Sequence, residues 1–343
     1  MSYLLSYKSR MENTLPYASV VIYSVIAMCY GLILSSWPNE YFRDRFNYIL
    51  YAERFEDIAS SYSSASWLVN EPLFLTYNYL LSFLFTPEQV PQVGVFFIAS
   101  TIAFFILRHA HSYLMIFVGF AFLFFISYTF HLQLVVLRQG IATALLLWIV
   151  YFFYKKKYFP ILFFLLSFVH VSFFIVFLIV FYEKFLGIFI KDFTLRIILF
   201  CTSLFALSFV LLKVASSLGV RQAEGEHLLN NTASGGGFIL FAFLFLFFYL
   251  RGLNNVENNP YGKIALLGIL SYLVFYFTIP VSGRLIATFL PFFYIYVISC
   301  TNGKIHFSAY VFLLINLILF AGSITGGSLT NIGSEKFYSI VPF

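Results

Sequence analysis

The chain has 343 residues, of which 61% are hydrophobic and 22% aromatic, whereas only 10% are charged. A soluble domain carries roughly 25% charged residues, so this composition excludes a soluble enzyme, a nucleic-acid-binding domain, a disordered chain and a disulfide scaffold. The formal net charge of +6 is typical of a membrane protein whose lysines and arginines retain loops in the cytoplasm. The composition therefore predicts a single integral membrane domain over residues 1–343.

Apolar runs follow one another along the chain, separated by short polar segments. Backbone groups in hydrocarbon need internal partners, and these runs lack the alternation of barrel strands, so each is expected to be helical. The runs lie at Tyr17–Ser36, Leu73–Phe85, Val93–Leu107, Tyr113–Phe130, Leu132–Tyr154, Tyr158–Tyr182, Arg196–Leu212, Gly237–Leu250, Lys263–Ser282, Leu285–Cys300 and His306–Gly322. We predict an all-α polytopic membrane protein with about nine to eleven transmembrane helices.

Lysines and arginines set the predicted orientation of these helices. Lys8 and Arg10 precede the first run and place the N-terminus in the cytoplasm. The three lysines Lys155–Lys157 mark a second cytoplasmic segment. Residues 37–71 then form a first external loop, and residues 215–237 form a second one.

Two of the apolar runs do not fit this orientation as ordinary spans. Leu73–Phe85 is short for a crossing and follows Glu71-Pro72, a good helix start. We expect it to be an interfacial or re-entrant helix. Tyr158–Tyr182 begins and ends beside lysines, so we expect a helical hairpin bent near His170.

Three ionisable residues interrupt apolar sequence. Arg138 lies within the run Leu132–Tyr154, Arg284 lies between two runs, and His170 lies within a third run. A charge at the bilayer centre costs ~2.5–3.5 kcal/mol, and no Asp or Glu lies inside any apolar run. A partner for either arginine must therefore come from an external loop, a backbone carbonyl or a ligand. The planar guanidinium suits a phosphate; the alternative is an arginine that snorkels to the interface.

The first external loop combines a carboxylate with aromatic rings. Asp44, Tyr48 and Tyr51 share one face if this segment is helical, and Glu71 and Asn78 share a face of the helix that follows. A carboxylate and rings can bind the hydroxyls and the apolar faces of a sugar, whereas the alternative is an ordinary solvated loop.

Further candidates complete the predicted site. Gln139, beside Arg138, and Arg221, in the second external loop, are candidate substrate-binding residues. His170 is either a general base or a hydrogen-bonded core histidine. The sequence contains no metal-ligating motif, so neither a metal nor a cofactor is expected.

The order of these motifs resembles the EpsG family of bacterial exopolysaccharide proteins, which is related to Wzy-type O-antigen and capsule polymerases. The segment that carries most of the resemblance is Leu137–Ala144, Leu-Arg-Gln-Gly-Ile-Ala-x-Ala. The other motifs are Asp44, Tyr48 and Tyr51, then Glu71-Pro72-x-Phe74 with Asn78, then Lys155–Lys157, Phe168–Ser172 and Ser282-Gly283-Arg284.

The resemblance implies a GT-C-like, metal-independent polymerase. Such a protein joins oligosaccharide repeat units at the outer face of the bacterial cytoplasmic membrane, and both donor and acceptor are carried on undecaprenyl diphosphate. Arg138 and Arg284 would bind the diphosphate, and His170, Glu71 or Asp44 would be the base. The expected partners are the two lipid-linked oligosaccharides and the bilayer, with a flippase and a chain-length regulator as candidate protein partners and no nucleic acid.

Three other functions are compatible with a polytopic membrane protein. A flippase needs alternating access and is usually built from repeats, which the sequence does not show. An acyltransferase would need a buried histidine–carboxylate pair near the cytoplasmic entry, and the sequence does not reveal one. An O-antigen ligase differs mainly in its acceptor, so polymerase and ligase both stay open.

Overall fold

The computed structural model describes residues 17–62, 70–217, 236–250, 253–278, 282–301 and 303–325. Every regular element in these ranges is a helix, which confirms the predicted all-α fold. The elements are α2 (Tyr17–Ser35), η1 (Asn39–Tyr41), α3 (Arg45–Glu53), α4 (Phe55–Ser61), α6 (Pro72–Ser82), α7 (Gln89–His109), α8 (Tyr113–Phe125), α9 (Ser127–Leu134), α10 (Leu137–Phe153), α11 (Phe159–Leu166), α12 (Phe173–Phe189), α13 (Phe193–Ser217), α15 (Gly236–Leu250), α16 (Leu253–Glu257), α17 (Pro260–Phe275), α18 (Ser282–Ser299) and α19 (Gly303–Thr325). Arg221 and most of the predicted second external loop lie outside the described residues.

Several helices are long and apolar enough to cross a bilayer, as expected of a polytopic membrane protein. By length and composition these are α2, α7, α13 and α18, and the pair α8–α9, bent by 73°, could form a fifth span. Helices α10, α15 and α17 are apolar but shorter, as is the apolar stretch His306–Gly322 within α19. The outward faces of α2, α13 and α19 expose large apolar side chains such as Ile33, Phe205 and Ile318, which suits contact with lipid.

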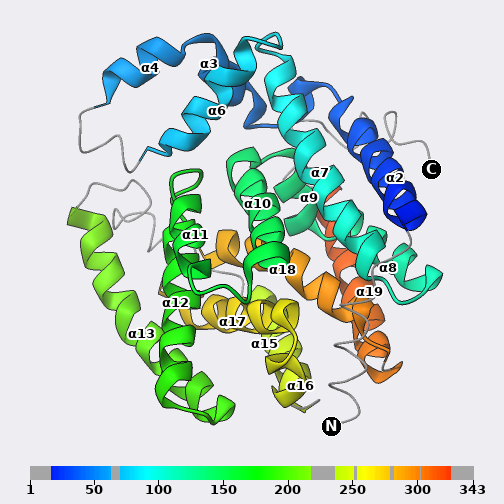
Figure 1. Cartoon of the computed structure of the whole chain (residues 1–343), viewed down its shortest axis with the longest axis vertical. Helices are drawn as coiled ribbons and strands as arrows, with labels where there is room; N and C mark the ends of the chain where they lie inside the picture. Colours follow the sequence, from blue (N-terminus) through cyan, green and yellow to red (C-terminus); the bar gives the residue numbers. More distant parts are fainter. Residues whose placement is uncertain are drawn as a thin grey trace.

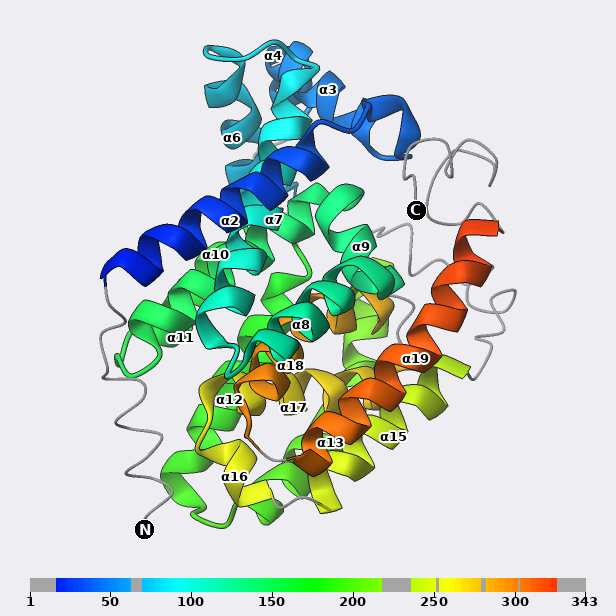
Figure 2. The same cartoon turned by 90° about the vertical axis from the view of Figure 1, so that its right-hand side faces the viewer.

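Helices α3, α4 and α6 gather at one end of the molecule, which we call the cap, and α16 lies at the opposite end (Figures 1 and 2). Salt bridges connect helices away from the cap. Glu183 of α12 pairs with Arg196 of α13 (2.8 Å) and with Lys263 of α17 (2.7 Å). Arg108, at the end of α7, donates to the Tyr151 hydroxyl of α10 (2.6 Å).

Helices α11 and α12 form the hairpin that the sequence predicts. The Lys184 ammonium of α12 lies 4.3 Å from the ring centre of Phe159 at the start of α11, and it donates to the carbonyl of Tyr154 (3.5 Å). The far end of α12 therefore returns to the level at which α11 begins. The chain reverses at residues 167–172, so His170 lies at the bend.

The run Leu132–Tyr154 is not one helix, and this part of the prediction is wrong. The chain breaks at Val135 and Val136, so Arg138 lies in the first turn of α10 rather than within a continuous span. The break frees the Leu134 carbonyl, which accepts a hydrogen bond from Nε of the buried Arg45 (3.1 Å). Hydropathy does not reveal such a break, because a side chain 89 residues away supplies the missing donor.

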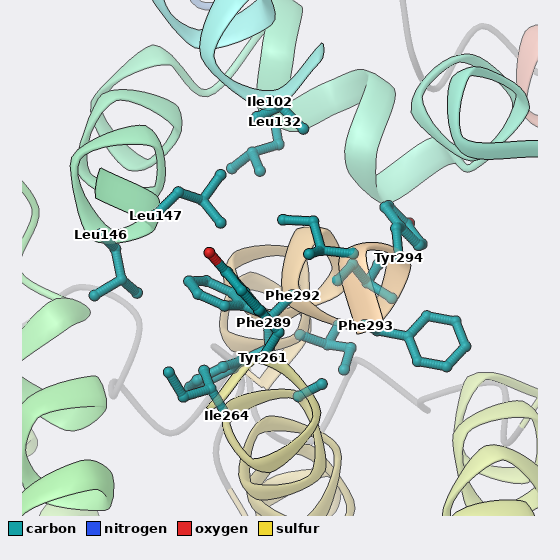
Figure 3. Packing of buried hydrophobic residues seen from close by; sticks show 14 of the residues in the cluster. Ile102, Leu132, Leu146, Leu147, Tyr261, Ile264, Phe289, Phe292, Phe293 and Tyr294 are labelled. Carbon is teal, nitrogen blue, oxygen red and sulfur yellow. The ribbon is translucent and has the colours of Figure 1, made fainter. Parts of the chain in front are cut away.

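The core lies where α7, α9, α10, α17 and α18 meet. Figure 3 shows side chains from all five helices at this point, including Ile102, Leu132, Leu147, Ile264 and Phe289. Helix α18 is buried along most of its length. In lipid the hydrophobic effect does not drive helices together. Their association therefore depends on close van der Waals packing, which small residues permit.

Gly268 of α17 lies directly against α18 in the core. A Cβ atom at this position would lie 2.0 Å from Cγ of Phe289, so the two helices need a residue without a side chain here. Gly322 of α19 is its natural control, because a Cβ atom there would meet nothing within 4 Å.

We predict that Gly268→Ala lowers the thermal stability of the purified protein, whereas Gly322→Ala does not. Overpacking costs ~1–3 kcal/mol, against a gain in helix propensity of up to ~1 kcal/mol that both variants share. Thermal unfolding in detergent measures both variants side by side. Equal midpoints for the two would contradict the close packing of α17 on α18.

Candidate functional site

The carboxylate of Glu71 joins three segments at the boundary between the cap and the helical body. One oxygen, Oε2, accepts a hydrogen bond from Nη1 of Arg138 at the start of α10 (2.6 Å). The other, Oε1, accepts from Nδ1 of His170 and from the backbone amide of Val171 (3.1 Å). Three of the roughly four acceptor positions of this carboxylate are thus used by protein donors.

The backbone of Glu71 is held in an unusual conformation. It is the one non-glycine residue with positive φ in the described ranges (φ 57°, ψ 55°). The following Pro72 opens α6, and the Leu73 amide donates to the Phe168 carbonyl (3.0 Å). Left-handed backbone at a non-glycine residue costs on the order of 1–3 kcal/mol and tends to occur at functional sites.

Glu71 is ionised despite its burial. Its side chain is only 7% exposed, and burial by itself raises its pKa. The hydrogen bond from His170, the positive charge of Arg138 and the Val171 amide outweigh this effect and lower the pKa to about 2. An acid with this pKa is a poor base near neutral pH, so we interpret Glu71 as a positioning residue rather than as the proton acceptor.

The ionised carboxylate also determines the tautomer of His170. A carboxylate can only accept, so Nδ1 of His170 carries the hydrogen and, in the neutral ring, Nε2 carries the lone pair. The His170 side chain is 5% exposed, and Nε2 makes no hydrogen bond within the described residues. A buried acceptor of this kind needs a ligand or water as its partner.

A second buried polar atom beside this histidine has no partner in the described part of the chain. It is the hydroxyl of Ser172, two residues after His170. Natural proteins leave few such groups unpaired. Together with Nε2 of His170, it favours a polar ligand at this position.

Aromatic rings surround the guanidinium of Arg138. Its Cζ lies 5.9 Å from the ring centre of Tyr48, 5.7 Å from that of Tyr51 and 5.9 Å from that of Phe74. Tyr48 and Tyr51, predicted to share one face of a helix, therefore both lie beside Arg138. The side chain of Arg138 is 34% exposed, so part of this group remains open to a ligand.

Gln139, a predicted substrate-binding residue, contacts α18. Its amide is buried and donates to the backbone carbonyl of Arg284 and to the Thr288 hydroxyl (2.8 Å) on α18. Gln139 therefore ties the start of α10 to the start of α18, which favours a structural role over substrate binding. The bond brings the backbones of the two arginine-bearing segments together, and the Arg284 side chain is exposed.

Asp44 and Asn78 do not contact Arg138 or Glu71 in the described contacts. Asp44 lies directly before α3 and makes no side-chain cap there. Asn78 is buried and donates to the Phe74 carbonyl within its own helix (2.7 Å). Both residues belong to elements of the site, and their predicted contact with substrate stays a prediction.

Two features of the site are absent from the sequence prediction. The first is the buried histidine–carboxylate pair itself, because Glu71 and His170 are 99 residues apart. It lies beside the cap and not near the lysines, where an acyltransferase would require it. The second is Tyr62. Its hydroxyl forms a hydrogen bond with Tyr51 and interacts electrostatically with Arg138 and Glu71. No motif marks Tyr62 in the sequence.

The model of the EpsG family matches residues 41–331. The chain belongs to the EpsG family. No curated protein and no solved structure matches the chain. The EpsG family is associated with glycosyltransferase and polymerase activity, so a polymerase-like role in polysaccharide synthesis agrees with membership.

Within this EpsG-family protein, the site offers three kinds of chemistry in one place. Arg138 supplies a fixed positive charge, His170 supplies a positioned acceptor, and the rings of Tyr48 and Tyr51 supply flat apolar surfaces. A reaction that builds negative charge on a leaving group while a hydroxyl loses its proton would use all three.

Proposed function

We propose that this protein is a polymerase that joins lipid-diphosphate-linked oligosaccharide repeat units into a surface polysaccharide. The observation that carries the proposal is the contact of one buried carboxylate with both a partly exposed arginine and a histidine whose second nitrogen has no partner. Family membership supports glycosyl transfer as the reaction type. The polyprenyl-diphosphate donor and the oligosaccharide acceptor are parts of the proposal.

The reaction that we infer breaks one bond and forms one bond at the anomeric carbon of the donor sugar. The acceptor hydroxyl gives its proton to Nε2 of His170, and its oxygen forms the new glycosidic bond. The bond between the anomeric carbon and the diphosphate oxygen breaks, and its electron pair stays on the diphosphate. The growing chain thereby moves from its carrier lipid to the non-reducing end of the incoming unit.

Arg138 and Arg284 would stabilise the diphosphate as its charge increases. A guanidinium has five N–H donors, so the hydrogen bonds of Arg138 with Glu71 and Tyr48 leave donors for phosphate oxygens. Preorganised donors that face a developing charge are usually the largest contribution to such a reaction. Glu71 would keep Arg138 in place before the substrate arrives, and the rings beside it would carry the sugar.

The same proposal includes a place in the cell. Lys155–Lys157 and Lys184 lie together away from the cap, and lysines favour the cytoplasmic side. The cap and the Arg138 site would then face outward from the bacterial cytoplasmic membrane. Carrier lipids with assembled repeat units are expected on that side, together with the flippase that delivers them and a regulator of chain length.

We predict that a strain without this protein accumulates single repeat units on the carrier lipid, and that Arg138→Ala does not restore long polymer. Removal of one such donor costs about 10²–10³-fold in rate. Gels of lipid-linked glycans measure the product, and Arg54→Ala, an exposed arginine between α3 and α4, is the control that restores it.

The same gels separate the proposed function from its alternatives. Loss of every externally exposed unit in the deletion strain would indicate a flippase. Full-length polymer that stays on its carrier would indicate a ligase. Normal polymer with Arg138→Ala, at equal protein level, would exclude Arg138 as a ligand of the leaving group.

A second prediction concerns His170. In His170→Asn the amide nitrogen can replace Nδ1 as the donor to Glu71, but no acceptor remains at the position of Nε2. We expect this variant to keep most of its thermal stability and to lose about 10²–10⁴-fold in polymerisation rate. Retained activity in His170→Asn would show that the histidine only supports Glu71, and His170→Ala, which lacks both nitrogens, is the reference for loss of stability.

A further inference from the structure

Four lysines lie close together on the side of the helical body away from the cap. Lys155, Lys156 and Lys157 occupy the turn between α10 and α11, and Lys184 lies on α12. The hairpin of α11 and α12 brings Lys184 beside this turn, as its contacts with Phe159 and the Tyr154 carbonyl show. We call these four residues the lysine cluster.

No ion pair neutralises the lysine cluster. Within the described ranges, none of the four lysines forms a salt bridge. Glu183, the acid next to Lys184, forms its salt bridges with Arg196 and Lys263 instead, and it acts on Lys184 only at longer range.

Large apolar side chains beside the cluster are exposed. They lie within four residues of a cluster lysine in the sequence. They are Phe152, Tyr158, Ile161, Phe185 and Ile188, with exposed fractions between 46% and 75%. A ligand for this surface must therefore offer negative charge next to hydrocarbon.

The position of the cluster along the helices agrees with the head-group region of a bilayer. Helix α10 has 17 residues, with Arg138 in its first turn and Lys155 just beyond its end. At 1.5 Å per residue this separates the two sites by roughly 25 Å, which is close to the ~30 Å thickness of a hydrocarbon core. A helix of this length along the membrane normal would place the lysine cluster and the Arg138 site in opposite leaflets.

We propose that the lysine cluster binds the phosphate head groups of acidic phospholipids in the leaflet opposite the Arg138 site. The ammonium groups would take the phosphates, and the exposed aromatic and aliphatic side chains would contact the acyl chains. The exposed apolar side chains favour a lipid over a free phosphate. The binding is independent of glycosyl transfer, because no residue of the cluster contacts the Arg138 site.

Native mass spectrometry of the full-length protein in a neutral detergent tests this site. The probes are phosphatidylglycerol, with phosphatidylcholine as the zwitterionic reference and inorganic phosphate as a competitor. We expect wild-type protein to retain phosphatidylglycerol in preference to phosphatidylcholine, and Lys156→Gln/Lys184→Gln to bind it about thirtyfold more weakly, at ~1 kcal/mol per lysine. Inorganic phosphate should not displace the lipid.

Charge-matched variants separate lost charge from damaged structure. Lys156→Arg/Lys184→Arg should retain the lipid within a few-fold, and Arg54→Gln in the cap should leave binding unchanged. If Lys184→Gln prevents folding, Lys155→Gln/Lys156→Gln removes the same charge from an exposed turn and should show the same loss. Equal retention of both lipids, unchanged binding in the Gln variants, or displacement by inorganic phosphate would each overturn the proposal.

Discussion

The ionised, buried carboxylate of Glu71 is the constraint on which the site depends. It fixes the start of α10 through Arg138, and it fixes the bend of the α11–α12 hairpin through His170 and the Val171 amide. Removal of one partner from a fully buried ion pair costs ~3–5 kcal/mol. The 34% exposure of the Arg138 side chain reduces this figure, whereas the hydrogen bonds from His170 and the Val171 amide add to it, against ~1–3 kcal/mol of strain in a left-handed residue. The ion pair can therefore hold Glu71 in a conformation that its backbone alone would avoid.

The bilayer explains why such contacts are needed. Helices that break at membrane depth leave carbonyls and amides that lipid cannot satisfy. At the break between α9 and α10, the buried Arg45 donates to the Leu134 carbonyl, to the Trp37 carbonyl (3.1 Å) and to the Asn39 side chain (3.2 Å). This arginine connects the cap to the end of α9, which only two residues separate from α10.

The sequence predicts those parts of the fold that follow from local hydropathy and charge. The first span, the short helix after Glu71-Pro72 and the hairpin near His170 all agree with α2, α6 and α11–α12. The break before Arg138 does not follow from the sequence, since Val135 and Val136 are as apolar as their neighbours. Only the distant Arg45 reveals that a helix ends there.

The same limit applies to the candidate site. The absence of acids inside the apolar runs implied that a partner of Arg138 could come from an external loop, and Glu71, at the end of that loop, is this partner. Glu71 pairs with His170, which lies 99 residues away, so no local motif predicts this contact. Nor does any motif predict that the Gln139 amide donates to Thr288 of α18. The sequence therefore predicts which residues belong to the candidate site. Only the packing of the helices shows which of them position others, as Glu71 does, and which are left to react, as His170 is.

A double-mutant cycle between Glu71→Gln and Arg138→Gln tests the central interaction most directly. The free energy of unfolding of the purified protein in detergent is measured for wild type, both single variants and the double variant. If the carboxylate holds the arginine as described, the two substitutions are not additive, with a coupling free energy of ~1.5 kcal/mol or more. Additivity within ~0.5 kcal/mol would show that Glu71 and Arg138 act independently and would contradict this account of the site.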